Sequence, residues 1–139
     1  MRCFLLVNFL TLLQISTIFC QSINWQKTSH WKLYNIRDDN AFGYSLDTLS
    51  QFKSTDMDSS KMQVFLGNVK VLPTPKYAMW MGLYVTTCQL EDGTIRKIDI
   101  SKYGGFFYDE KKKTYYELPS ELSDAWLKYM RDCLKILSN

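Results

Sequence analysis

The chain has 139 residues, with 17 Lys and Arg against 14 Asp and Glu, and 46% of its residues are hydrophobic. The formal net charge of +3 is small and mixed along the sequence, unlike the concentrated basic surface of nucleic-acid-binding proteins, so we expect no nucleic-acid partner. The length beyond the first twenty residues suits one domain that buries its own hydrophobic core.

The first twenty residues have the layout of a secretory signal peptide. Arg2 precedes an apolar stretch over residues 4–19, and polar sequence begins at Cys20 and Gln21. We therefore expect a signal peptide over 1–20 and a mature domain over 21–139, located in the periplasm or secreted. The apolar stretch is shorter than the roughly twenty residues of a spanning helix, so no stable membrane span is expected.

Two alternatives to simple cleavage remain open for this segment. One is lipidation of Cys20, which would leave a membrane-tethered lipoprotein, although Phe19 stands where lipoprotein signals usually have a small residue. The other is a buried N-terminal helix, which the absence of charge after Arg2 disfavours, because a core helix normally carries a charged face.

The first half of the mature chain predicts one strand and two helices. Residues 31–36 alternate with the period of two that is typical of a strand, and residues 37–40 have turn chemistry. Ser45 is a candidate N-cap for a short helix. A second helix is predicted over 62–69, and Gly67 within it indicates close packing; its apolar face comprises Met62, Phe65, Leu66 and Val69.

The second half predicts two consecutive hairpins. A strand over 77–90 is apolar on both alternating sets, as expected of a central strand. Asp92-Gly93 predicts a type I′ turn, and the returning strand, 94–101, then places Thr87 opposite Ile98 and Val85 opposite Ile100. The next hairpin spans residues 106–116, with the solvated lysines 111–113 at its tip.

The best helix signal follows Pro119, where apolar residues recur at helical spacing: Leu122, Trp126, Tyr129, Met130, Cys133 and Leu137. Together with the two hairpins, this helix indicates an α+β fold. We predict an antiparallel meander of four to five strands with two or three helices packed on one face, a two-layer arrangement.

No catalytic constellation is visible in the sequence. His30 is the single histidine, so a nucleophile–histidine pair or a Cys/His metal site has poor prospects, and we expect His30 at the surface. The acidic residues are mostly at turns or on the solvent-facing side of the last helix. Asp99 lies within a predicted strand, where a cross-strand salt bridge would explain it. We expect no enzyme activity, no metal and no cofactor.

Cys88 and Cys133 are the two cysteines of the expected mature domain. An exported protein can form a disulfide from such a pair. Both also stand on faces that the pattern marks as buried, where a free cysteine is common. A disulfide and two inert core thiols therefore both remain open.

The aromatic residues, 15% of the chain, suggest a binding surface. Neighbouring strand residues point to opposite faces, so the aromatics of the second hairpin cannot all face the helices. We expect an exposed, partner-binding patch at the hairpin tip, made of Tyr108, Tyr115, Tyr116 and Lys112, on a protein that is a monomer or a weak homo-oligomer.

The stretch 102–109, followed by Tyr115–Pro119 and a closing helix through Trp126-Leu127, resembles small exported bacterial α+β proteins of unassigned function. Some of these are similar to periplasmic immunity proteins that neutralise interbacterial toxins. The resemblance implies a protein-binding role and transfers no catalytic residue. We therefore expect an exported immunity protein or an inhibitor of a toxin or lytic enzyme. The alternative is a carbohydrate- or envelope-binding module that uses exposed aromatics.

Overall fold

A computed structural model describes residues 23–36, 43–73, 83–102 and 104–138. Several predicted features lie outside these residues: the signal peptide with Cys20, the turn at 37–40 and the first part, 77–82, of the predicted central strand.

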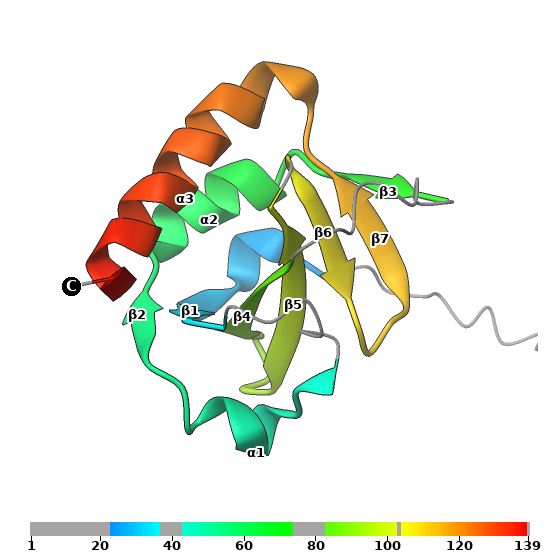
Figure 1. The fold of residues 1–139 in the computed structure, drawn as a ribbon. Helices are drawn as coiled ribbons and strands as arrows, with labels where there is room; N and C mark the ends of the chain where they lie inside the picture. The colour runs from blue at the N-terminus through cyan, green and yellow to red at the C-terminus, as the bar shows by residue number, and fades with distance from the viewer. Residues whose placement is uncertain (1–22, 37–42, 74–82, 103, 139) are drawn as a thin grey trace, which may run out of the picture.

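In the described residues, seven strands form one antiparallel sheet in the order β2-β1-β4-β5-β6-β7-β3 (Figure 1). The strands are β1 (Ser29–Tyr34), β2 (Ser54–Asp56), β3 (Lys70–Leu72), β4 (Leu83–Gln89), β5 (Ile95–Ser101), β6 (Phe106–Asp109) and β7 (Thr114–Glu117). The α+β class and the meander from β4 to β7 are confirmed. The sheet is larger than predicted because β2 and β3, of three residues each, add an edge at either side.

Three α-helices pack on this sheet, with 3₁₀ turns η1 (Trp25–Lys27) and η4 (Ser120–Leu122) beside them. The helices are α1 (Leu46–Leu49), α2 (Ser59–Leu66) and α3 (Ser123–Ser138). Figure 1 shows α2 and α3 next to one another, with α1 far from both. Ser45 caps α1 as expected, accepting a hydrogen bond from the Thr48 amide at 3.3 Å.

Helix α2 begins and ends three residues earlier than predicted, because Asp58 caps its start and the chain leaves the helix at Gly67 toward strand β3. A Cβ atom at Gly67 would collide with the side-chain amide of Gln26 in η1, so the close packing inferred from this glycine is confirmed. The residues that follow pair with β7, where Val71 lies opposite Tyr116. This pairing joins segments far apart in sequence, which a local pattern does not reveal.

The main core lies between the sheet and helices α2 and α3. The apolar stripe of α3 is buried as the sequence predicts, and so are Met62, Phe65 and Leu66 of α2. The largest side chains without exposed surface in this core are Trp31, Trp126, Phe107, Leu33, Met62, Leu66, Ile98 and Ile100. Burial of this apolar surface supplies the main driving force for folding.

The hairpin of β4 and β5 differs by one residue from the predicted register. Thr87 pairs with Lys97, and Val85 pairs with Asp99. The loop contains three residues instead of two, because the Leu90 amide donates to the Thr94 carbonyl at 2.9 Å and Gly93 takes a φ of 82°. A left-handed glycine is typical of the last position in such a loop. A slip of one residue exchanges the cross-strand partner of every side chain.

The opposite face of the sheet is also covered in part. Leu49 of α1 packs with Ile36 and with Val85 of β4 in a second small cluster, to which Tyr44 and Phe52 add half-buried rings. The expectation that the helices share one face therefore holds for α2 and α3, while α1 packs on the other face. This cover removes water from side chains on that face of the sheet.

Candidate functional site

The expected exposed aromatic patch is not present at Tyr108 and Tyr116. These side chains are 7% and 2% exposed. Tyr116 faces the main core and meets Trp25 edge to face, with ring centroids 5.2 Å apart. Tyr108 lies on the other face of the sheet and stacks on the half-buried Tyr115 at 4.4 Å. Alternation separates Tyr115 from Tyr116 as predicted, but both faces are packed here.

Lys112 is exposed at the hairpin tip together with Lys111 and Lys113, which confirms the solvated tip. Asp109 holds this tip in shape by accepting hydrogen bonds from the amides of Lys111 and Lys112 at 3.0 and 3.2 Å. The same carboxylate, fully buried, forms an ion pair with Arg96 at 2.9 Å. Lys112 is therefore exposed as expected, whereas Tyr108 and Tyr116 are buried.

Cys88 and Cys133 are two free, buried thiols in the structure, not a disulfide. Burial raises the pKa of Cys88 to about 12 and also raises the pKa of Cys133. A thiol is nucleophilic only as the thiolate, so neither group is activated in this state. His30 is exposed, as expected.

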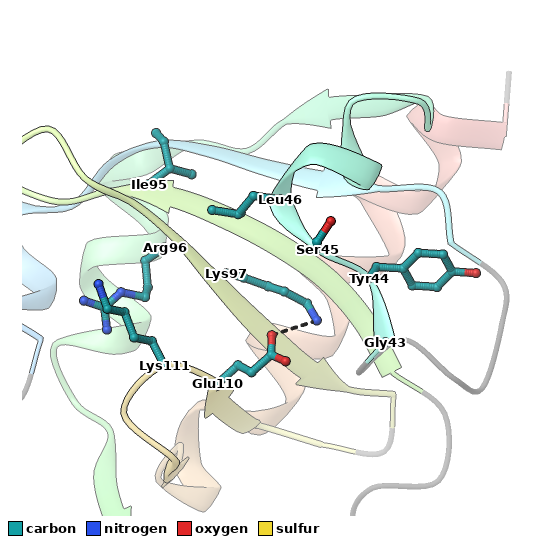
Figure 2. A pocket seen from close by; sticks show the side chains of 9 residues that line it. All are labelled: Gly43, Tyr44, Ser45, Leu46, Ile95, Arg96, Lys97, Glu110 and Lys111. Carbon is teal, nitrogen blue, oxygen red and sulfur yellow. Dashed lines mark ion pairs between the residues drawn. The ribbon is translucent and has the colours of Figure 1, made fainter.

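A pocket of about 340 Å³ lies beside β5, and we call it the β5 pocket (Figure 2). Its lining comes from the start of α1, from the beginning of β5 and from the turn after β6: Gly43, Tyr44, Ser45, Leu46, Ile95, Arg96, Lys97, Glu110 and Lys111. Lys97 is only 6% exposed. Figure 2 shows its side chain directed at Glu110, and the ammonium nitrogen lies 3.0 Å from the Glu110 carboxylate.

Asp99 lies two residues further along β5, on the same face as Lys97. Its nearest oxygen is 3.6 Å from the Lys97 ammonium, and neither oxygen has a hydrogen-bond partner among the described residues. Burial disfavours the charged form and raises the pKa of Asp99 to about 7, although Lys97 acts in the opposite direction. The predicted cross-strand salt bridge is thus wrong: the neighbouring cation is on the same strand.

This buried carboxyl group makes the stability of the protein depend on pH in a definite direction. Because the pKa of Asp99 rises from 3.8 to about 7 on folding, its contribution is fully present below pH 3.8 and is lost as the pH rises toward 7. We expect the free energy of unfolding to fall across this range, and Asp99→Asn to remove that part of the slope. Urea titrations at a series of pH values measure it.

The matched control is Asp92, an exposed aspartate in the β4–β5 loop. The hydrogen bond from the Thr94 amide lowers the pKa of Asp92, so its contribution has the opposite sign and is lost as the pH falls. Asp92→Asn should therefore leave the slope above pH 4 unchanged. An unchanged slope in Asp99→Asn would show that Asp99 does not titrate in this range.

A second concave surface lies between α2 and α3, and we call it the helix groove. It has a volume of about 600 Å³ and is lined by Ser60, Lys61, Val64 and Phe65 of α2 and by Ala125, Lys128, Tyr129 and Asp132 of α3. The rings of Phe65 and Tyr129 stack at 5.9 Å, and the Lys61 ammonium lies 5.4 Å from the centre of the Tyr129 ring.

The helix groove is rigidly built at one end and exposes apolar surface. The Tyr129 hydroxyl accepts a hydrogen bond from the Asp58 amide at 2.8 Å, and Asp58 in turn caps α2 through the Ser60 amide. Val64 is 61% exposed. The helical pattern of the sequence predicts the buried face of α2 but gives Val64 no role; an apolar residue just outside that face was the signal for this surface.

Across the described ranges, no cluster of three or more His, Cys, Asp or Glu side chains is suited to hold a metal ion. No helix in them has the length and apolar character that crossing a membrane requires. No family model matches the chain, and no curated protein or solved structure is significantly similar to it.

Proposed function

We propose that this protein is an exported, non-enzymatic binding protein that holds a segment of a partner protein in the helix groove. The observation that carries the proposal is the exposed apolar surface at Val64, flanked by lysines on both helices. An immunity protein or an inhibitor of a toxin or lytic enzyme is the form of binding protein that the sequence resemblance favours. Residues 1–20 would direct its export and would then be removed, which leaves the mature protein in the periplasm or outside the cell.

The chemistry of the groove favours an amphipathic helix with acidic side chains as the occupant. A groove between two helices that exposes apolar side chains can accept the apolar face of a third helix. Lys61 and Lys128 line the groove against one acidic residue, Asp132, and that carboxylate has Lys135 at 4.0 Å. Acidic groups beside the apolar face of the partner would therefore meet complementary charge, which promotes association and orients the complex.

The carbohydrate alternative finds less support. The large hydrophobic side chains that are exposed within the described residues are all aliphatic: Leu46, Val64, Val71, Ile95, Leu127 and Ile136. A sugar-stacking platform needs exposed aromatic rings.

A synthetic amphipathic peptide with one leucine face and flanking glutamates tests the proposal. We expect Val64→Asp to weaken its binding at least tenfold, because it places a charge on the exposed apolar surface of the groove, and Lys128→Glu to weaken it by a similar factor. Fluorescence anisotropy of the labelled peptide measures both. The same peptide with lysines in place of glutamates should bind at least tenfold more weakly to the unmodified protein.

Val71→Asp is the matched control, since Val71 is 59% exposed on the edge strand β3, outside the groove. It should leave peptide binding within twofold of the unmodified protein. Equal losses in the Val64 and Val71 variants, or equal binding of the basic and acidic peptides, would contradict the assignment of the groove.

A further inference from the structure

The β5 pocket holds a buried ammonium group with two carboxylate neighbours, of which the nearer is partly exposed. Lys97 is almost inaccessible, yet Glu110, its partner at 3.0 Å, is about one-third exposed and stands in the turn after β6. A buried charge needs a counter-charge, because its removal from water costs several kcal/mol. The Glu110 carboxylate can turn toward solvent, whereas the Lys97 ammonium is buried and has its other carboxylate neighbour, Asp99, at 3.6 Å, so an anion in the place of Glu110 restores the closer ion pair.

The other half of the pocket is apolar and open. Leu46 at the start of α1 and Ile95 at the start of β5 both line the pocket and are both exposed large hydrophobic residues. They come from segments far apart in sequence, as Figure 2 shows. An exposed apolar wall next to a buried charge is the usual composition of a small-molecule site, and the volume of about 340 Å³ falls in the range of such sites.

The charges around the pocket favour an anionic ligand. Lys111 lines the pocket and is exposed. The Arg96 guanidinium is held by Asp109 at 2.9 Å, so it is not required for the ligand. Glu110 is the acidic residue of the lining, and a ligand carboxylate that replaces it on Lys97 restores the same type of ion pair.

We infer that the β5 pocket binds small amphiphilic carboxylates. The carboxylate of the ligand accepts a hydrogen bond from the Lys97 ammonium in place of Glu110, and its apolar chain covers Leu46 and Ile95. No bond is formed or broken. This site lies apart from the helix groove and does not depend on the proposed function.

Asp99 makes the binding depend on pH. It faces the Lys97 ammonium, and its charge also bears on Glu110 and Tyr108. Protonated Asp99 carries no charge that competes with the ligand for Lys97, while ionised Asp99 repels the incoming carboxylate and competes for the same cation. Affinity for the carboxylate should therefore decrease as the pH rises through about 7.

Octanoate is a suitable probe, with octylammonium as the charge-reversed control, in isothermal titration calorimetry. We expect octanoate to bind at least tenfold more tightly than octylammonium at pH 6 and to lose at least threefold in affinity at pH 8. Glu110→Gln should strengthen octanoate binding at least threefold, because it removes the competing carboxylate. Glu91→Gln, at an exposed glutamate in the first hairpin loop, is the matched control and should have no effect.

A second variant, Leu46→Glu, tests the apolar wall and leaves every buried side chain unchanged. Leu46→Glu should weaken octanoate binding at least tenfold, while Leu127→Glu on α3, also at an exposed leucine, should leave it unchanged. Both variants are at exposed positions and should fold. Equal affinity for the two probes, or weaker octanoate binding in Glu110→Gln, would overturn the inference.

Discussion

Trp126→Ala is expected to lower the free energy of unfolding by about 3–5 kcal/mol, the usual cost of a large-to-small change at a buried aromatic. Trp126 has no exposed surface and joins the closing helix to two other elements. Its ring centroid lies 5.2 Å from that of Phe65 in α2 and 5.0 Å from that of Phe107 in β6. Urea denaturation followed by circular dichroism measures the loss.

The neighbouring residue supplies the control. Leu127 is exposed on the same turn of α3, so Leu127→Ala should change the free energy of unfolding by no more than about 0.5 kcal/mol. A comparable change in both variants would mean that α3 is not docked through the stripe that contains Trp126.

Asp109→Ala is expected to cost about 3–5 kcal/mol, because it leaves the guanidinium of Arg96 buried without its partner. The Arg96 side chain is nearly inaccessible and Asp109 is fully buried. The variant also removes the hydrogen bonds to the amides of the hairpin tip. Denaturation at constant pH and ionic strength measures the change.

Two further variants separate the buried pair from the turn. Asp92 accepts a hydrogen bond from the Thr94 amide at 2.9 Å but is exposed, so Asp92→Ala should destabilise the protein much less than Asp109→Ala. Replacing the pair together, with Arg96→Met and Asp109→Leu, should recover most of the loss, since no unpaired charge then remains. If the double variant is as unstable as Asp109→Ala, the turn hydrogen bonds dominate instead.

Local patterns in the sequence are sufficient for the elements whose stability is mostly local. The 3.6-residue stripe of α3 runs over four turns and predicts its buried face. Ser45 predicts the cap of α1, and the three lysines predict the exposed hairpin tip. Two successive hairpins predict the meander from β4 to β7. In each case, residues close in sequence carry the information, and the α+β class follows from them.

The candidate sites depend on contacts that no local pattern contains. The helix groove is formed by the outer sides of α2 and α3, which are separated by more than half of the sheet in chain order. The β5 pocket exists because the segment before α1 lies beside β5 and the turn after β6. The contacts that form these two sites join segments far apart in sequence, so they cannot be predicted from the spacing of residues along the chain.

The sequence by itself determined the class of the fold, its meander and the buried stripe of its last helix, because each of these repeats with the period of its own element. Only the tertiary structure decided the register of β4 with β5, the edge strands β2 and β3, and the burial of Tyr108 and Asp99. Alternation in a strand specifies which residues share a face, but not what covers that face. Here packing on both faces of the sheet turns an expected patch of tyrosines into core and leaves a carboxyl group beside a buried lysine.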